Sequence, residues 1–475
     1  MKVSCHKFKQ ESKRALGDSH LQKALRIVDE RLRAKRDQAF RELENGEELR
    51  SKAHEIKKHT LEHLDEYLEK LESSVERIGG TVHWASDSKS ACNIIENIAL
   101  ENRVHTIVKG KSMVTEEIEL NDRLISRGFD VFETDLGEFI IQLADEPPSH
   151  IVGPAIHKTK EQISRLLSEK FNIERMDDPE DMTLFARKTL REKFLNADMG
   201  ITGVNFAVSE TGTIVLFENE GNIRLSTTLP RIHVAIMGIE KVIPTLNDLG
   251  VLIKLLARSA TGQKMPVYMS MISGSRRKGE RDGSDVFHLV ILDNGRSAIL
   301  NDEPLKETLF CIRCGACLNS CPVYLKAGGH AYGWVYSGPI GSILTPQMVD
   351  REKAGQLPYA STLCGACAEI CPVKINIPGI LLELRRRYTE ESDWKAPTSL
   401  LEKALVSLYS SSMEKRFLYE KGAFAARLIQ RPFIVESSLS RRLSCIKKHR
   451  GTYNIQPFSK QSFRQQFKAR KGYGK

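Results

Sequence analysis

The sequence predicts a multidomain protein that joins an α/β domain to largely helical parts. Its 475 residues are enough for about two to four domains of ~100–200 residues each. Short apolar runs alternate with amphipathic stretches between residues 75 and 297, as in βαβ units. Two cysteine-rich runs follow, and charged sequence with helical spacing lies at both ends. We expect four parts: 1–74, 75–297, 298–390 and 391–475.

The first part, 1–74, is expected to be a helical extension. Residues 21–75 are highly charged, and their apolar residues recur at helical spacing, which predicts one or two long amphipathic helices. Gly79 and Gly80 follow where a left-handed helix cap is expected. His59 and His63 stand four residues apart and could in principle bind a metal, but their charged neighbours favour a solvated polar face.

The second part, 75–297, is expected to contain a parallel sheet covered on both faces, because strands and helices alternate along it. Strands are predicted at 81–85, 106–109, 130–133, 205–209, 213–217, 233–237, 267–271 and 288–292. Helices are predicted at 90–102, 114–128, 151–171 and 182–195. A turn at 293–296, Asp-Asn-Gly-Arg, closes the domain.

The third part, 298–390, carries the strongest motif of the chain. Residues 311–322 read Cys-Ile-Arg-Cys-Gly-Ala-Cys-Leu-Asn-Ser-Cys-Pro, the C-x2-C-x2-C-x3-C-P run that holds an iron–sulfur cluster. Three cysteines spaced two residues apart can bind one cluster from a single loop. The fourth, Cys321, normally binds the other cluster of a two-cluster ferredoxin.

A second run at 361–372 repeats the first, with Ser361 in the place of Cys311. The crossed pattern predicts two ligand sets: for cluster one, Cys311, Cys314, Cys317 and Cys371, and for cluster two, Cys321, Cys364 and Cys367. Structural zinc also uses C-x2-C pairs, but four cysteines in eleven residues with a trailing Cys-Pro fit a cluster better than one tetrahedral ion.

The ligand set of cluster two has three cysteines, one fewer than a 4Fe-4S cluster normally takes. Cluster one is expected to be 4Fe-4S, whereas cluster two is either 3Fe-4S or a 4Fe-4S cluster whose last iron takes Ser361, another side chain, water or a ligand. The glycine-rich segment between the runs carries Tyr332, Trp334 and Tyr336, and we expect it to form an ordered loop against the clusters. A helix is predicted at 380–387.

Composition and charge indicate the cellular compartment of the protein and the class of its partners. No run of ~18 apolar residues and no apolar signal core occurs, so we expect a cytoplasmic protein without a transmembrane segment. Seven of the ten cysteines fall in the two runs, which fits a reducing compartment. Residues 391–475 hold 18 Lys and Arg against 6 Asp and Glu. This basic, partly helical region could meet nucleic acid, an anionic membrane surface or an acidic protein partner. Leu, Phe and Tyr recur among the charges and no nucleic-acid-binding signature is present, which favours the protein partner.

The α/β domain offers weaker candidate sites, since it has neither a dinucleotide fingerprint nor a P-loop. Glycine turns at 209–213 and 218–224 could bring polar residues to one end of the sheet, where open α/β folds bind ligands. Those residues are Glu210, Glu218, Asn222 and Arg224, and polar hairpin corners explain them as well. Residues 109–112, Lys-Gly-Lys-Ser, could meet an anion at a strand-to-helix turn, or form an ordinary turn. His150, His157, His233 and His288 are each more typical of packed or surface positions than of ligands.

Several segments together resemble a known family, the lactate utilization B proteins. These segments are 111–117, 133–138, 148–152, 203–213, 218–222 and 292–296, followed by the two cysteine runs. The family comprises the iron–sulfur proteins of a three-protein bacterial system that oxidises L-lactate to pyruvate. The resemblance covers roughly residues 70–475. The order of the cysteine runs after this α/β domain is more specific than the runs alone.

The resemblance implies a fold, a cofactor set and partners. The α/β domain should share the fold of sugar-phosphate isomerases and coenzyme A transferases, and the cysteine-rich part should be a helical ferredoxin domain. The same seven cysteines should bind the two clusters. The partners should be the two other lactate utilization proteins, with a further electron acceptor that is not identified. The family supplies no catalytic residue for the α/β domain.

Three functions follow as hypotheses. The first is an electron-transfer subunit of a complex that oxidises L-lactate, with most of the carbon chemistry on a partner. The second is an oxidoreductase whose own α/β domain binds and oxidises a small 2-hydroxy acid, with Glu210 or a histidine as base. The third is a redox sensor whose clusters control ligand binding or a partner contact.

Overall fold

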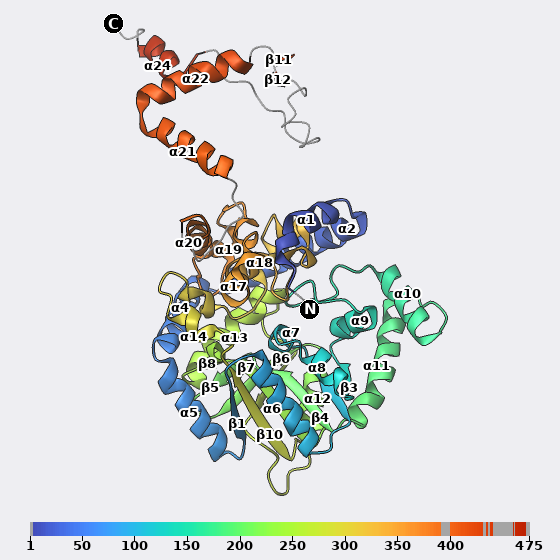
Figure 1. Cartoon of the computed structure of the whole chain (residues 1–475). Helices are drawn as coiled ribbons and strands as arrows, with labels where there is room; N and C mark the ends of the chain where they lie inside the picture. The colour runs from blue at the N-terminus through green and yellow to red at the C-terminus, as the bar shows by residue number, and fades with distance from the viewer. Residues whose placement is uncertain are drawn as a thin grey trace. The chain divides into compact units, whose positions relative to one another are not determined.

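The computed structural model describes residues 3–390, 400–430, 434–435, 438–439, 459 and 461–471. The chain divides into two compact units, Met1–Ala396 and Pro397–Lys475 (Figure 1). The first unit contains the α/β domain and the cysteine runs. The finer boundaries expected at 74/75, 297/298 and 390/391 stay predictions.

A six-stranded parallel sheet forms the centre of the first unit. Its strands are β1 (Thr81–Ala85), β2 (Thr106–Lys109), β3 (Asp130–Glu133), β4 (Met199–Gly203), β7 (Ile232–Gly238) and β10 (Val286–Leu292). They lie in the order β1-β10-β7-β4-β2-β3, and every neighbouring pair is parallel. The predicted parallel sheet is therefore confirmed.

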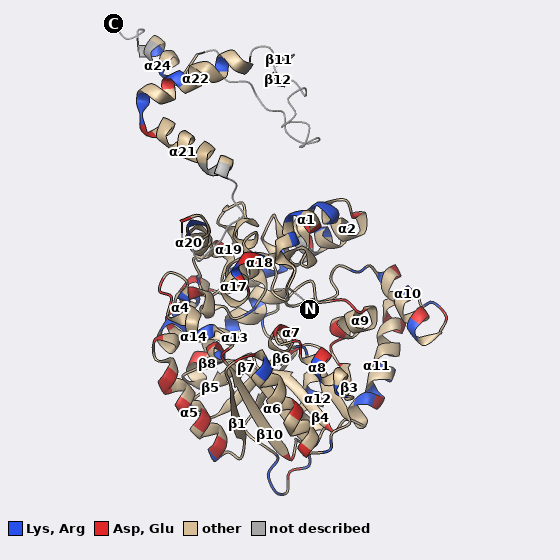
Figure 2. Ribbon diagram, viewed as in Figure 1, with Lys and Arg blue, Asp and Glu red and all other residues tan. Residues whose placement is uncertain are grey.

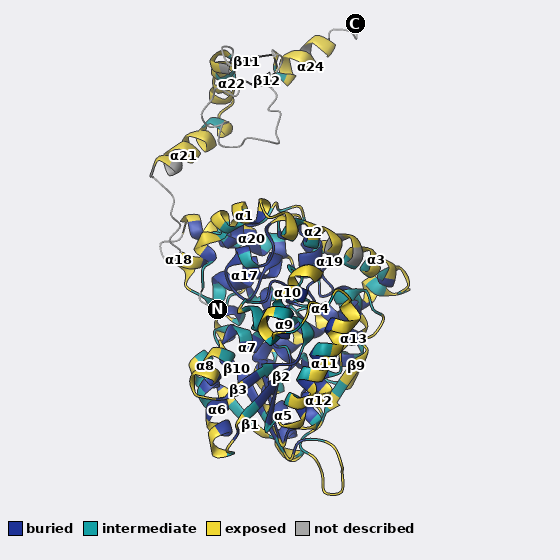
Figure 3. Ribbon diagram, turned by 90° about the vertical axis from the view of Figure 1, so that its right-hand side faces the viewer, coloured by how far each residue is buried: buried dark blue, intermediate teal, exposed yellow. Residues whose placement is uncertain are grey.

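Both faces of this sheet are buried, as expected of a parallel sheet that helices cover on each side, because successive residues of a strand point to opposite faces and both kinds lie in a core. Val234 and Ile236 of β7 belong to a core shared with helices on one face, whereas Ala235 and Met237 belong to the core on the other. Figure 3 shows buried residues along the central strands and exposed ones on the outer sides of surrounding helices. The helices of this region are α6 (Ser88–Glu101), α7 (Met113–Glu117), α8 (Leu120–Ser126), α9 (Leu136–Ala144), α10 (Lys160–Phe171), α11 (Pro179–Leu195) and α12 (Asn222–Thr228).

A second, four-stranded sheet is formed by strands that lie between β4 and β10 in the sequence, and it shares a hydrophobic core with the first sheet. Its strands are β5 (Phe206–Val208), β6 (Thr213–Glu218), β8 (Val242–Ile243) and β9 (Tyr268–Ile272), in the order β8-β5-β6-β9. Its helical neighbours in sequence are η3 (Ile239–Lys241) and α13 (Leu246–Thr261), and α14 (Arg296–Leu300) follows β10. The long helix α13 packs against the N-terminal helices.

The N-terminal extension is more broken than predicted. It contains η1 (Cys5–Lys7), α1 (Phe8–Leu16), α2 (Ser19–Val28), the π-helical turn η2 (Asp29–Arg33), α3 (Ala34–Arg41), α4 (Gly46–Glu62) and α5 (Leu64–Arg77). The chain interrupts the helical pattern at 42–45, just before Gly46, and again at His63. Gly79 has the left-handed conformation expected of a cap, with φ of 85°.

Two predicted helices were wrong in extent. The helix expected at 114–128 is split into α7 and α8 because Glu119 is left-handed, with φ of 54°. The helix expected at 151–171 begins only at Lys160, where Thr159 and Gln162 form a capping box. Helices α9 and α13 were not predicted.

The cysteine-rich segment is built from short helices. These are η4 (Lys306–Phe310), α15 (Ala316–Asn319), α16 (Tyr324–Ala327), η5 (His330–Tyr332), α17 (Gly338–Met348), α18 (Arg351–Ala354), η6 (Leu357–Tyr359), α19 (Ala366–Ile370) and α20 (Ile377–Glu390). Tyr332, Trp334 and Tyr336 are buried, so the segment between the runs is ordered, although part of it is the helix α17 rather than a loop.

The second unit is described only in part. It contains α21 (Leu400–Glu414), α22 (Arg416–Gln430), β11 (Ile434–Val435), β12 (Ser438–Leu439) and α24 (Phe463–Lys471). Figure 2 shows basic residues on α22 and α24. The remainder of the expected basic region lies outside the described residues. Among the described helices, none combines the length and apolar character that crossing a membrane requires.

Candidate iron–sulfur site and the adjoining cavity

The two cysteine runs adopt the same local backbone. The residue before the second position of each run, Arg313 or Leu363, is left-handed, with φ of 60° and 55°. The glycine that follows the second cysteine position, Gly315 in the first run and Gly365 in the second, has φ of 76° and 85°, respectively. A side chain at either glycine would be strained, and the glycine lets the chain turn into α15 or α19. The sequence repeat is therefore also a structural repeat.

Four thiols from both runs lie together as one group. Burial raises the pKa of Cys314, and the thiols of Cys311 and Cys371 raise it further. Burial, with Cys311 also contributing, raises the pKa of Cys371 to about 11. The pKa of Cys317 is raised by burial and by all three of these thiols. The thiol of Cys371 therefore lies close to the thiols of the first run, although Cys371 belongs to the second run.

The other three thiols form a second group. Burial raises the pKa of Cys321, and Cys364 raises it further. Burial followed by the thiols of Cys321 and Cys364 raises the pKa of Cys367 to about 12. Cys367 also raises the pKa of Cys317, so the two groups adjoin. These groups are the two ligand sets that the crossed pattern predicts, and the ligand assignment itself stays a prediction.

Backbone N–H groups are directed at the sulfur atoms. Arg313 N–H lies 3.4 Å from Cys311 Sγ, and Ile375 N–H lies 3.4 Å from Cys371 Sγ. N–H donors to sulfur stabilise the thiolate and shift the potential of a bound cluster. In the second run, Leu363 N–H donates to Ser361 Oγ at 3.1 Å. Ser361 Oγ therefore occupies, in the repeat, the position of Cys311 Sγ.

The donor set fits iron–sulfur clusters. All seven cysteines of the runs are free, and Cys314, Cys321, Cys367 and Cys371 are buried. Ionised thiolates held this close repel one another, which adds to burial in raising the pKa values of Cys314, Cys317, Cys321, Cys367 and Cys371, and bound iron would supply the positive charge that offsets this repulsion. Six of the seven thiols are largely withdrawn from solvent, whereas Cys364 is exposed.

A buried ion cluster joins the first run to the α/β domain. Arg296 donates to both carboxylate oxygens of Glu117, at 2.9 and 2.8 Å, and to Glu240 Oε2 at 2.7 Å. Tyr336 donates its hydroxyl to Glu117 Oε2 at 2.7 Å. The guanidinium of Arg313 lies over the Tyr336 ring, 4.9 Å from its centroid. Residues of α7, η3 and α14 therefore position the loop that carries Cys311 and Cys314.

A cavity of about 360 Å³ lies at the carboxyl ends of β2, β4 and β7, which we call the sheet-end cavity. Such an edge of a parallel sheet is the usual ligand-binding position of open α/β folds. Its polar wall includes Lys111, Asp135, Asn205, Glu218, Glu220 and Asn222, with Lys241, Arg313, Cys314 and Tyr336 next to the first run. Of the seven cysteines of the runs, Cys314 alone lines it, so the cavity is distinct from the space between the thiols.

Only part of the site proposed in the α/β domain comes together here. Glu218 and Asn222 line the cavity, and Glu218 accepts the N–H groups of Ile223 and Arg224 at 2.6 and 2.8 Å. Glu210 is exposed on the turn after β5 and, like Arg224, does not line the cavity. This corrects the expectation that all four polar residues meet at one end of the sheet.

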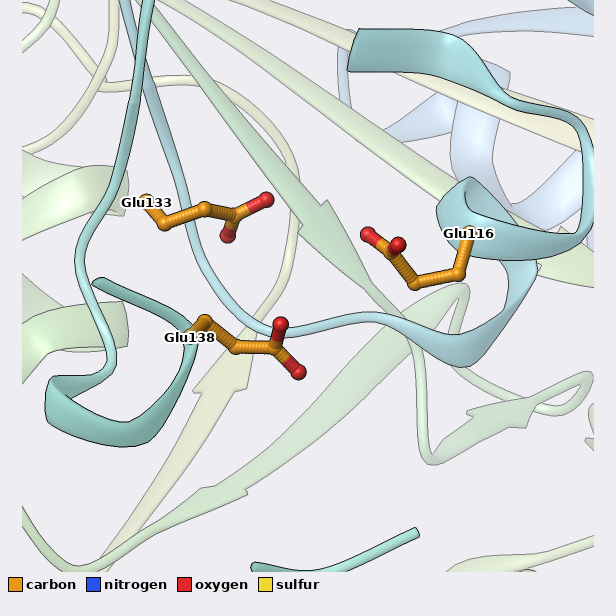
Figure 4. Close-up of side chains that lie close together, drawn as sticks. All are labelled: Glu116, Glu133 and Glu138. Carbon is orange, nitrogen blue, oxygen red and sulfur yellow. The ribbon is translucent and has the colours of Figure 1, made fainter. Parts of the chain in front are cut away.

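Lys109 is occupied by carboxylates rather than open to a ligand. It is fully buried and pairs with Glu133 at 2.7 Å and Glu116 at 3.0 Å. Figure 4 shows the carboxylates of Glu116, Glu133 and Glu138 directed toward one another. Because the Lys109 ammonium already lies between two of these carboxylates, we assign the group a structural role. Lys111, by contrast, lines the sheet-end cavity and donates to Val152 O at 2.7 Å.

The candidate histidines are packed, as expected. His150 accepts the N–H groups of Val152 and Gly153 and contacts Asn319 Oδ1 at 3.1 Å, which fastens a loop to α15. Burial lowers the pKa of His150 and of His157 to about 4. His233 bonds Thr202 Oγ1, and His288 bonds His83.

Lys241 and Arg313 are site residues that the sequence reading did not single out. Lys241 follows β7 in an unremarkable sequence, Gly-Ile-Glu-Lys, with no motif around it. Arg313 lies within the first cysteine run, where only the cysteines carried a signal. Their position on the cavity follows from the way β7 and the first run meet in space.

Comparisons with known proteins agree with this architecture. Residues 68–292 match the family described as LUD domain, and residues 307–375 match the 4Fe-4S dicluster domain. The chain is 43% identical to lactate utilization protein B of Shouchella clausii over 475 residues, covering 100% of this chain and 99% of that protein. It is 43% identical to lactate utilization protein B of Bacillus licheniformis over 472 residues, covering 99% and 98%.

A solved structure is also similar to part of the chain. It is a DUF162 family protein from Deinococcus radiodurans, 14% identical, which covers 48% of this chain and 98% of that chain with a TM-score of 0.28. This score is too low to support an assignment of fold or function.

Proposed function

Because the chain belongs to the lactate utilization protein B family, we propose that it is the iron–sulfur electron-transfer subunit of a complex that oxidises L-lactate to pyruvate. The chain carries a LUD domain and a 4Fe-4S dicluster domain, and the resemblance first seen in its motifs is confirmed. The proposal assigns the electron-transfer role to the seven cysteines of the two runs.

The grouping of the thiols is the observation that carries the proposal. Cys371 adjoins the first run and Cys321 adjoins the second, and the two groups meet at Cys317 and Cys367. A bound iron–sulfur cluster accepts and releases electrons at a potential set by its surroundings. Backbone N–H groups and the neighbouring cations Lys57, Lys241 and Arg313 would stabilise the negative charge of a cluster held by Cys311.

We propose further that Ser361 completes cluster two as a 4Fe-4S cluster. The support is its place in the repeat, since its hydroxyl oxygen accepts the N–H group that matches the one on Cys311 Sγ. Ser361→Ala should then convert the second cluster to a three-iron form with its distinct electron paramagnetic resonance signal. Ser361→Cys should keep four irons. A four-iron signal that Ser361→Ala leaves unchanged would assign the last iron to another ligand.

The proposal includes partners and a location. The partners are the two other lactate utilization proteins and an electron acceptor. The second unit supports a protein partner, because α22 carries Arg416, Lys421 and Arg427, and both α21 and α22 expose apolar side chains such as Leu401, Leu408 and Phe417. The free cysteines support a reducing compartment, which we take to be the cytoplasm.

The test is reduction of the clusters by substrate. Anaerobically purified chain with L-lactate alone should show no cluster reduction, and addition of the two partner proteins should produce it. Electron paramagnetic resonance reports the reduced clusters directly. Absence of reduction in the complete mixture, with lactate oxidised at its normal rate, would contradict the electron-transfer role. Reduction by lactate without partners would favour the rival in which this chain is itself the oxidising enzyme.

A further inference from the structure

The sheet-end cavity contains a buried lysine that makes no hydrogen bond or ion pair with the residues the structure describes. Three lysines are buried in the part of the chain that the structure describes: Lys57, Lys109 and Lys241. Lys57 donates to the carbonyl of Glu240, and Lys109 is paired with two carboxylates. Lys241 is 7% exposed, lines the cavity and makes no hydrogen bond or ion pair with a described residue. Burial lowers the pKa of Lys241 to about 8 although the Glu240 carboxylate attracts the ammonium, and Glu240 is itself paired with Arg296. A ligand of opposite charge in the cavity would offset this cost of burying the charge.

Arg313 supplies a second, independent indication. Its side chain is 8% exposed, its Nη2 is 3.5 Å from Glu240 Oε1, and its Nη1 is buried without a partner among the described residues. Stacking on Tyr336 fixes the plane of the guanidinium. Lys241 and Arg313 both line the cavity, and charge-assisted bonds from such donors are the usual means of holding a carboxylate.

The rest of the wall limits the ligand. Glu218 accepts the N–H groups of Ile223 and Arg224 of α12 and makes no ion pair with Lys241. Asp135 and Glu220 also line the cavity and would oppose a dianion such as phosphate. Ile253, Leu256 and Ala257 of α13 provide an apolar side. A singly charged anion with a short carbon chain fits these walls better than a phosphate ester.

We propose that the sheet-end cavity binds a short-chain organic monocarboxylate whose carboxylate is held by Lys241 and Arg313 beside Cys314. Nothing in the family or domain matches assigns a ligand to this cavity. The proposal rests on the proposed function only for the choice of L-lactate and pyruvate as probes. A ligand bound here would lie next to the first cysteine run and alter the surroundings of its cluster.

The experiment is calorimetric titration of the anaerobically purified full chain, without partners, with L-lactate, pyruvate, acetate and inorganic phosphate. Lys241→Met removes the charge and keeps the length of the side chain. Lys254→Met is the matched control, since Lys254 lies on the exposed side of α13. Iron content and melting temperature of each variant establish that it is folded and carries its clusters. The electron paramagnetic resonance spectrum with and without ligand is a second readout.

We expect a carboxylate to bind the unmodified chain, to shift the spectrum of cluster one, and to bind Lys241→Met at least tenfold more weakly, which corresponds to about 1.4 kcal/mol. Lys254→Met should bind as the unmodified chain does. Failure of all the carboxylates to bind the iron-loaded chain would overturn the proposal, as would equal weakening in both variants or tighter binding of phosphate.

The design also separates this inference from the proposed function. Lys241 and Arg313 could serve only to balance the charge of a cluster on Cys311. In that case Lys241→Met would shift the potential of cluster one while no carboxylate bound either protein, and the cavity proposal would be wrong. Lactate-dependent cluster reduction in the presence of partners could still be observed, so the electron-transfer role would stand.

Discussion

Replacing Arg296 with Met tests how the α/β domain holds the first cysteine run. Arg296 is fully buried and pairs with Glu117 and Glu240, which are also buried. The substitution keeps the apolar length of the side chain but leaves two buried carboxylates without their main counter-charge. Loss of one partner of a buried ion pair typically costs about 3–5 kcal/mol.

The loss of stability in Arg296→Met should not exceed this range, because both carboxylates keep other polar contacts. Glu117 keeps hydrogen bonds from Tyr336 and from Asn294, each at 2.7 Å, and Glu240 keeps its 3.5 Å contact with Arg313. With an unfolding entropy of ~2.1 cal/mol/K per residue over the unit Met1–Ala396, about 3–5 kcal/mol lowers the melting temperature by roughly 4–6 °C.

The assay is thermal unfolding of anaerobic protein followed by circular dichroism. The double variant Arg296→Met with Glu117→Gln removes one of the two carboxylate charges left without a partner, so its loss of stability should be smaller than the sum of the two single losses by about 0.5–3 kcal/mol. A fall of less than about 1 °C in Arg296→Met would refute the reasoning. So would a double variant whose loss equals the sum of the two single losses.

Two further predictions concern pH and packing. Burial lowers the pKa of His150 and His157 to about 4 and that of His233 to about 3, against an ordinary value of 6.5, so the unfolded chain binds protons that the folded chain does not as pH falls through this window. The melting temperature should therefore fall steadily from about pH 6.5 toward pH 4, and a flat profile down to pH 5 would argue against buried neutral histidines. A Cβ at Gly329 would overlap the carbonyl oxygen of Ser149, so Gly329→Ala should cost about 1–3 kcal/mol in a urea unfolding series. Gly250→Ala on α13 meets no atom within 4 Å and should be neutral or slightly stabilising; equal losses in both would show that the close approach at Gly329 is not the cause.

The sequence alone predicts the parts of this molecule that depend on local spacing. The parallel strands follow from short apolar runs between turns, and the cysteine runs follow from a contiguous motif. Helix α13 was missed because its run 251–257 is apolar at every position except Lys254 and directly follows Gly250, so a short buried strand was as good an interpretation as a helix. The break between α7 and α8 was missed because its left-handed residue is Glu119 and not a glycine, which would have indicated a turn.

The sheet-end cavity could not be predicted in the same way. Its walls come from the loops after β2, β4 and β7, from α13 and from the first cysteine run, which meet only in the folded chain. Glu117 and Arg296 are 179 positions apart, and although each ends a segment that resembles the family, nothing in the sequence shows that they pair. For Lys109 the sequence left an anion site and an ordinary turn open, and only the structure shows the glutamates that surround this lysine.

Iron content of two matched double variants tests the crossed ligand sets most directly. Cys314→Ala with Cys371→Ala removes two ligands of cluster one if the ligation is crossed, so about four irons should remain in cluster two. Cys364→Ala with Cys371→Ala then damages both clusters and should leave less iron. The reverse order, with iron retained in the second variant and lost from the first, would mean that each run holds its own cluster and would contradict the account.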